Sequence, residues 1–252
     1  MQQQQRESAI LAAVTRRGQC SVLDLADELG VSDETVRRDL KRLQAAGLVR
    51  KVHGGVTQAE PNGEARFRLR LEEEADAKRA IARRAAAEVR DGDSLMLDTG
   101  TSTLYVARAL LDRRNLRVVT NCVDIARLLM ARPGNQVFMA GGELRADDGA
   151  ALGPSAAAFV EQFRVRLAFL SIAAIDLEDG LMDYELAEAE FSRVVMRRAE
   201  RTVVVADHSK FGRRALVSVC GLSAVQAIIT DRPLAPAFAA RLQHAEVMVA
   251  EG

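Results

Sequence analysis

The stretch "SLMLDTGTSTLYVARAL", residues 94–110, decides the fold class of the larger part of this chain. Its apolar run at 95–97 has the length of a short buried strand, and a helical pattern resumes after residue 103. Between them the chain has one carboxylate, one glycine and four hydroxyl side chains. A polar loop between a buried strand and a helix is typical of ligand-binding loops in α/β proteins.

The alternation of strands and helices continues on both sides of this stretch. Apolar runs predict strands at 94–97, 116–119, 136–140, 167–173, 202–206, 226–229 and 246–249. Amphipathic patterns predict helices at 74–90, 103–112, 123–131, 155–163, 184–200 and 234–243. This order predicts an α/β domain with a mostly parallel sheet and helices on both faces.

Composition limits the class of protein. The chain has 252 residues with 35 basic and 35 acidic side chains, so only local charge is informative about partners. Three cysteines lie far apart and have neither zinc-site nor disulfide-framework spacing. No long apolar run and no signal-peptide pattern is present. We therefore expect a cytoplasmic protein with no metal and no cofactor.

The N-terminal part has a different pattern. Residues 6–47 predict three short helices, with a glycine stop at Gly30 and a new helix start at Ser32. Residues 48–56 predict a tight hairpin, and a polar stretch containing a proline and a glycine follows. The expected organisation is an all-α winged helix-turn-helix at 1–57, a linker at 58–73 and an effector-binding domain at 74–252.

The third helix has an exposed basic face. From residue 37 to residue 53 there are six Lys or Arg side chains and one acid, which suits neutralisation of DNA phosphates. A pair of short helices followed by an exposed polar helix is the helix-turn-helix layout. Surface charge on an ordinary amphipathic helix is the alternative explanation. The candidate DNA-binding residues are Ser32, Thr35, Arg37, Arg38, Lys41, Arg42, Lys51, His53 and Gly54.

Two sets of strings resemble one family. "SVLDLADELGVSDETVRRDLKRLQAAGLVRKVHGGV" closely resembles the winged helix-turn-helix of the DeoR family of bacterial transcriptional repressors. "LDTGTSTLYVARAL", "VVTN", "GGELR", "EAE" and "ADHSKFG" resemble the effector domain of the same family, which is similar to ribose-5-phosphate isomerase. The resemblance implies a homo-oligomeric repressor, a dimer or a tetramer. It would bind double-stranded operator DNA, control sugar or polyol metabolism genes and respond to a phosphorylated sugar or polyol.

The candidate effector site follows from the loop and the resemblance together. Ligands of open parallel sheets bind at the carboxyl ends of the strands, and helix N-termini favour anions. Gly100 allows a close approach of backbone to ligand. Polar or glycine residues recur at the other strand ends. The candidate effector-binding residues are Asp98, Thr99, Gly100, Thr101, Ser102, Thr103, Thr120, Asn121, Gly141, Gly142, Glu188, Asp207 and Lys210.

The chain departs from the family pattern in three places. Ser171 and Ala174 stand where the family usually has glycines. Met182 and Asp183 stand where small hydroxyl residues are common, and Ser192 stands where a lysine is frequent. These positions are implied to lie near the sugar end of the pocket, so they bear on which sugar is bound.

Two other functions remain as alternatives. A sugar-phosphate isomerase fused to a DNA-binding module would use carboxylates such as Asp98, Asp176 or Glu188 as a base. A DNA-binding module has no use in a simple isomerase, and we therefore expect no enzyme and no catalytic residues. The second alternative is an architectural DNA-binding protein, whose affinity for DNA no metabolite would change.

Overall fold

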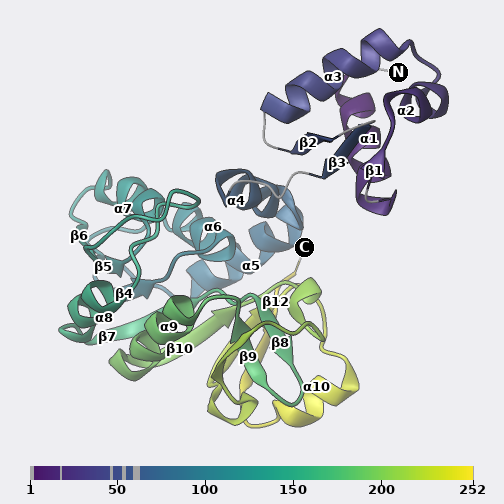
Figure 1. The fold of residues 1–252 in the computed structure, drawn as a ribbon. Coiled ribbons are helices and arrows are strands. Elements are labelled where there is room, and N and C mark those ends of the chain that lie inside the picture. The colour runs from purple at the N-terminus through teal and green to yellow at the C-terminus, as the bar shows by residue number, and fades with distance from the viewer. Residues whose placement is uncertain (1–2, 18, 46–47, 53–54, 59–62, 252) are drawn as a thin grey trace. The chain divides into compact units, whose positions relative to one another are not determined.

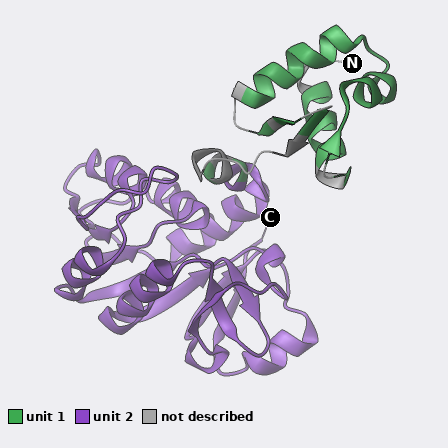
Figure 2. Cartoon of the chain, in the orientation of Figure 1, with its two compact units in different colours: residues 1–69 green, residues 70–252 purple. Residues whose placement is uncertain are grey.

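The computed structural model describes residues 3–17, 19–45, 48–52, 55–58 and 63–251. Two compact units make up the chain, residues 1–69 and residues 70–252 (Figure 2). His53 and Gly54, which the sequence analysis assigned to the DNA-binding face, lie outside the described residues. Each unit is described separately below.

Up to residue 58, the described part of the first unit has three helices and a small antiparallel sheet (Figure 1). The expected hairpin forms, and a short third strand, which the sequence analysis did not predict, pairs with its second strand. The elements are α1 (Gln3–Arg17), β1 (Gln19–Cys20), α2 (Val22–Leu29), α3 (Asp33–Ala45), β2 (Val49–Val52) and β3 (Gly55–Gln58).

Local signals set the ends of α2 and the start of α3. The Ser21 side chain accepts a hydrogen bond from the amide of Asp24, as an N-cap does. Gly30 has a φ of 62° and its amide donates to carbonyls of the last turn of α2, which confirms the predicted left-handed stop. The hydroxyl of Ser32 accepts from the amide of Thr35 and so caps α3.

An ion-pair network joins α1 to α3. Asp39 is fully buried, and Arg6 Nε of α1 donates to its carboxylate at 2.5 Å. Arg42 donates to Asp39 at 3.3 Å and to Glu7 at 3.4 Å. A buried carboxylate requires such partners, because desolvation of an unpaired charge is costly. The network therefore fixes the orientation of α3 relative to α1.

The second unit is built on a seven-stranded parallel sheet (Figure 1). The strand order is β13-β12-β10-β7-β4-β5-β6, and every pair is parallel. All seven strands predicted from the sequence are in this sheet. They are β4 (Ser94–Leu97), β5 (Arg117–Thr120), β6 (Gln136–Met139), β7 (Val165–Leu170), β10 (Ala199–Val205), β12 (Ala227–Thr230) and β13 (Glu246–Val249).

Helices cover both faces of this sheet, as predicted. The apolar side chains of α8 and α9 pack with those of β4, β5 and β7 in one core cluster. The opposite face is covered by α5, α6 and α7 (Figure 1). The helices are α5 (Ala75–Ala87), α6 (Thr101–Ala109), α7 (Val123–Met130), α8 (Pro154–Glu161), α9 (Leu186–Arg198) and α10 (Pro236–Arg241).

A second, antiparallel sheet was not predicted. Its order is β11-β9-β8, with β8 (Ala174–Asp176), β9 (Gly180–Asp183) and β11 (Val217–Cys220). Two short 3-10 turns, η1 (His208–Lys210) and η2 (Leu222–Ala224), flank β11. Gly180 has a φ of 79°, and a Cβ there would lie 2.2 Å from the carbonyl oxygen of Cys220. Only glycine therefore permits this approach of β9 to β11.

Residues Gly63–Glu72, within the segment expected to join two domains, form α4. The Lys78 ammonium donates to the backbone carbonyls of Arg70 and Glu73 at the C-terminal end of this helix. Tyr105 of α6 donates its hydroxyl to the carbonyl of Leu71 at 3.2 Å. Within the described ranges, the structure has no helix long and apolar enough to cross a membrane.

Candidate functional sites: a pocket at the sheet edge and a basic helix face

A pocket opens at the point where the strand order of the large sheet reverses. From β4 the chain proceeds outward to β5 and β6, and it then returns to β7 on the other side of β4. The loops after β4 and β7 therefore meet at the carboxyl edge, which is where ligands bind in open α/β sheets. The pocket is lined by Arg70, Glu73, Asp98, Thr99, Gly100, Thr101, Ser102, Asn121, Asp148, Leu152, Ser171, Ile172, Ala173, Asp183, Tyr184, Glu188, Phe191, Ser192, Lys210 and Arg213.

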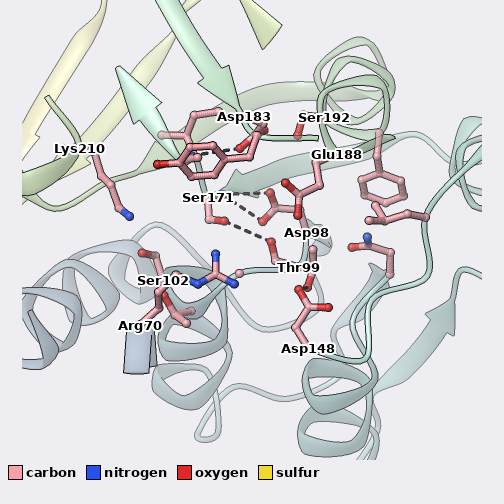
Figure 3. Close-up of a pocket in the computed structure, with 18 of the residues that line it drawn as sticks. Arg70, Asp98, Thr99, Ser102, Asp148, Ser171, Asp183, Glu188, Ser192 and Lys210 are labelled. Carbon is pink, nitrogen blue, oxygen red and sulfur yellow. Dashed lines mark hydrogen bonds between the residues drawn. The ribbon is translucent and has the colours of Figure 1, made fainter. Parts of the chain in front are cut away.

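Close contacts between Asp98, Gly100 and Ser171 hold the two strand ends together. The Ser171 amide donates to both carboxylate oxygens of Asp98, at 3.0 and 3.1 Å. The Ser171 hydroxyl donates to the carbonyl of Thr99 at 3.2 Å (Figure 3). A Cβ at Gly100 would lie 1.9 Å from the Ser171 Oγ, so only glycine fits this position.

The pocket has a donor-rich side at the start of α6. The first amides of a helix have no intrahelical acceptor and favour an anion, and Thr101 and Ser102 add hydroxyls to them. In Figure 3 the side chains of Lys210 and Arg70 lie on the same side of the pocket as Ser102. Burial lowers the pKa of the Lys210 ammonium, and the nearby Asp207 partly opposes that effect.

The opposite side is rich in carboxylates (Figure 3). Burial, and secondarily the charge of Glu188, raises the pKa of Asp183 to about 7. Burial also raises the pKa of Asp98 well above its usual range, while its hydrogen bond from Ser171 opposes the shift. Glu188 Oε1 accepts a hydrogen bond from Arg145 Nη2 at 2.6 Å.

Several described carboxylates of this pocket have a resolved pKa shift. Among them, Asp148 alone has a lowered pKa. Burial opposes its ionisation, but two hydrogen bonds from Arg145, at 3.1 and 2.6 Å, outweigh that effect. The hydroxyl of Thr99 donates to Asp148 at 3.3 Å. Thr99, in the loop at 98–103, is therefore hydrogen-bonded to a residue far away in the sequence. The sequence analysis did not identify that residue, Asp148, as part of the site.

The structure brings eight of the thirteen candidate effector residues to the pocket lining. These are Asp98, Thr99, Gly100, Thr101, Ser102, Asn121, Glu188 and Lys210. Asn121 donates its side-chain amide to the carbonyl of Ala151 at 3.1 Å, and its Oδ1 is buried without a partner in the described part of the chain.

The other five candidates lie outside that lining. Thr103 is fully buried and donates to the carbonyls of residues 98 and 100. The Thr120 hydroxyl accepts from the Cys122 amide, and Asp207 caps η1 through the amide of residue 209. Gly141 and Gly142 are exposed after β6.

Sequence reasoning missed several lining residues, among them Arg70, Glu73, Asp148 and Arg213. Arg70 and Glu73 lie at the end of α4 and just after it, in a stretch that showed no functional pattern. Asp183 and Ser192 were noted only as departures from the family strings, and both line the pocket. Their difference from the family strings was therefore the sequence signal that could have identified them as pocket residues.

The first unit presents the second candidate site. Arg37, Arg38 and Lys41 are exposed along α3, and Lys51 is exposed on β2. A hollow between α3 and the hairpin is lined by Arg37, Lys41 and Lys51. This arrangement offers cationic groups from a helix and a hairpin to one phosphate backbone.

The remaining DNA-binding candidates have internal contacts. The hydroxyls of Ser32 and Thr35 lie 2.9 Å apart at the start of α3. Arg42, half-buried, forms its ion pairs with Asp39 and Glu7 rather than extending from the exposed face. Among the described residues, no group of three or more His, Cys, Asp or Glu side chains is placed to hold a metal ion.

The fold and the two sites define a class: a DNA-binding regulator with a separate ligand-sensing unit. Residues 6–62 match the DeoR-like helix-turn-helix domain, and residues 73–232 match the DeoR C-terminal sensor domain. The chain belongs to the DeoR family of transcriptional regulators.

Curated relatives are similar to this chain over nearly its full length. The glycerol-3-phosphate regulon repressor of Escherichia coli is 35% identical over 92% of this chain and 92% of its own. The transcriptional repressor CsqR of the same organism is 34% identical over 97% of this chain and 94% of its own. The transcriptional regulator IolR of Bacillus subtilis is 30% identical over 93% of this chain and 92% of its own. This confirms that the chain is a transcriptional regulator rather than an enzyme.

Solved structures give a weaker likeness. Ribose 5-phosphate isomerase A of Methanocaldococcus jannaschii matches 55% of this chain and 55% of its own, at 18% identity and a TM-score of 0.40. A translation initiation factor eIF-2B of Pyrococcus horikoshii matches 90% of this chain and 86% of its own, at 14% identity and a TM-score of 0.45. Neither likeness bears on activity.

Proposed function

We propose that this protein is a repressor of sugar or polyol metabolism genes that a phosphorylated sugar or polyol releases from its operator. The curated relatives include glycerol-3-phosphate regulon repressors, which supports a phosphorylated effector. The observation that carries the proposal is the pocket at the start of α6, where helix amides, Ser102 and Lys210 offer donors to a phosphate.

The DNA-binding residues of the proposal are on the exposed face of α3 and on β2. Arg37, Arg38 and Lys41 would contact the major groove and its phosphates, and Lys51 would contact the backbone from the hairpin. His53 and Gly54 are included among the proposed DNA-binding residues only because of the resemblance to the DeoR family. Ser32, Thr35 and Arg42 would support the helix through their internal contacts.

We also propose a cytoplasmic homo-oligomer. A two-fold pair of helix-turn-helix units matches half-sites about one DNA turn apart, roughly 34–36 Å. The effector must bind the DNA-incompetent state more tightly than the competent state, because equal affinity for both would shift nothing. Residues 58–73 would join the domain at 1–57 to the domain at 74–252, and the segment 57–80 would transmit this preference.

The test combines binding and release. A panel of sugar and polyol phosphates is screened by thermal shift, and each compound that stabilises the protein is added to a protein–operator complex in a gel-shift assay. We expect at least one phosphorylated compound to raise the melting temperature and to dissociate the complex, while its dephosphorylated form does neither. Release by the dephosphorylated form alone, or stabilisation without release by every hit, contradicts the proposal.

A further inference from the structure

The pocket holds more acidic than basic side chains, although a phosphate ester is an anion. Five carboxylates and three cationic groups are among its lining residues, so acids outnumber bases. In Figure 3 Lys210 and Arg70 lie toward Ser102, and Asp98, Asp183 and Glu188 lie on the other side. The two ends of the pocket therefore differ in sign, and the acidic end requires an explanation of its own.

Among the described residues, two of these carboxylates form no ion pair, although the charges of Lys210 and Arg145 act on Asp183 from a longer distance. Asp98 is 5% exposed; its carboxylate accepts from the Ser171 amide, and its backbone carbonyl accepts from Thr103. Asp183 is 7% exposed and accepts from the Ala173 amide at 3.1 Å. Within the described ranges no Lys or Arg nitrogen lies within 4.0 Å of either carboxylate, whereas Arg145 pairs with Asp148 and Glu188.

Ser192 lies at the same end of the pocket and is 3% exposed (Figure 3). Its side chain is neutral, so it supplies no positive charge to the carboxylates at that end.

The chemistry of buried carboxylates selects between two kinds of ligand. Burial favours the protonated forms of Asp98 and Asp183, and the hydroxyl groups of a neutral sugar would leave these carboxyls in that form. A protonated amine supplies both a positive charge and several N–H donors, and charge-assisted hydrogen bonds are the stronger kind. Asn121 lines the same pocket, and its buried Oδ1 has no donor among the described residues.

We propose that the effector is a phosphate ester carrying a protonated amine, such as an amino sugar phosphate, whose ammonium group lies among Asp98, Asp183 and Glu188. This inference rests on the proposed function, because it assumes that the phosphate binds at the start of α6 beside Lys210. It assigns Asp183 and Ser192 as residues that determine specificity.

The test compares matched pairs of compounds by isothermal titration calorimetry on the full chain at pH 8. The pairs are D-glucosamine 6-phosphate with D-glucose 6-phosphate, D-galactosamine 6-phosphate with D-galactose 6-phosphate, and O-phosphoethanolamine with ethylene glycol phosphate. We expect the amine to bind about 10-fold more tightly than its hydroxyl counterpart in at least one pair, as a gained charge-assisted hydrogen bond would give.

Two outcomes separate the inference from the proposed function. If the hydroxyl compounds bind and no pair favours its amine by at least about threefold, this inference is wrong and the proposed function stands. If neither these esters nor inorganic phosphate binds, the phosphate site is wrong and the inference fails with it.

Two variants of pocket residues test where the ammonium group of the ligand binds. Asp183→Asn keeps an acceptor for the Ala173 amide but removes the charge, and Ser192→Lys adds a cation at the same end. Each should reduce the amine preference about 10-fold, with little effect on the hydroxyl compound. Glu190→Gln is the matched control, because Glu190 is exposed on α9 outside the pocket lining. An undiminished preference in both pocket variants, with melting temperatures no lower than that of the wild type, overturns the assignment.

Discussion

At the scale of single residues, the contact between Gly100 and Ser171 sets the geometry of the pocket. A methyl group at position 100 would lie 1.9 Å from Ser171 Oγ and 2.7 Å from its Cβ. Gly100→Ala should therefore destabilise the protein by about 1–3 kcal/mol, as overpacking does, and weaken effector binding. Ser171→Gly in the same chain removes both clashing atoms and should restore most of the loss. Urea unfolding of the two single variants and the double variant measures the coupling; simple additivity of the two changes would contradict the contact.

The exposed side chain of Arg38 leads to a corresponding prediction for operator binding. It is exposed on α3, and none of the described ion pairs involves it. Arg38→Ala should weaken operator binding by about 1–3 kcal/mol, or about 10-fold or more, and leave effector binding unchanged. Fluorescence anisotropy with labelled operator measures the first, and calorimetry the second.

Arg17→Ala is the matched control for that experiment. Arg17 is also exposed in the first unit, but it lies at the end of α1 and pairs with Glu28 at 2.7 Å. Its loss should leave operator affinity within about twofold, because an exposed ion pair contributes little to stability. Equal losses in both variants would mean that general charge, and not the face of α3, binds the DNA.

Asp183 gives a prediction on pH. Burial raises the pKa of Asp183 to about 7, so the folded chain holds this proton at pH values where the unfolded chain has lost it. The contribution of this group to stability therefore falls as pH rises from about 4 to about 7, and the loss is complete above that range. Asp183→Asn removes this loss. Its melting temperature should exceed that of the wild type by ~3 °C or more at pH 8, with a smaller difference at pH 5. An equal difference at both pH values contradicts the raised pKa.

At the scale of elements, sequence periodicity was sufficient to predict the large sheet. Its strands are short apolar runs, fully buried in β12 and partly exposed in the edge strands β6 and β13, and amphipathic helices separate most of them. The loop at 98–103 was placed correctly at a strand end because parallel strands all end at one edge. Periodicity also gave α2 and α3, whose caps at Ser21 and Gly30 are strong local signals.

The antiparallel sheet was missed for a physical reason. Its strands β8 and β9 have three and four residues, all buried, so no alternation of polar and apolar residues marks them. The acidic end of the pocket was hidden for the same reason, since Asp183 ends β9. Arg145 pairs with residues 3, 40 and 43 positions away, and sequence spacing cannot reveal such contacts.

The junction of α4 and α5 makes a prediction at this scale. Lys78, 3% exposed, donates to two carbonyls at the end of α4, and Arg70 from the last turn of that helix lines the pocket. Lys78→Met keeps the buried stem but removes the donors. It should weaken effector binding by about 1–3 kcal/mol and increase amide hydrogen exchange at residues 70–74. Unchanged exchange there would show that Lys78 does not hold the end of the helix.

At the scale of the whole molecule, two units with separate sites must influence one another through linkage. An effector that lowers operator affinity by a given factor must have its own affinity lowered by operator DNA by the same factor. The magnitude is typically about 5–150-fold for such couplings. This reciprocity concerns equilibrium binding alone, so it requires no assumption about how the units are arranged.

Thr101→Val tests whether the loop at the start of α6 is the origin of that coupling. The variant removes a hydroxyl from the donor-rich side of the pocket and should weaken effector binding about 10-fold, while operator affinity without effector stays at the wild-type value. Thr230→Val is the matched control, because Thr230 is fully buried and its hydroxyl has no partner among the described residues. Operator titrations with and without effector, and effector titrations with and without operator, give two coupling factors for each protein. The two factors must agree in the wild type and in Thr230→Val, and the effector concentration needed for release must rise about 10-fold in Thr101→Val. Release of Thr101→Val at the wild-type effector concentration would place the sensor elsewhere in the chain.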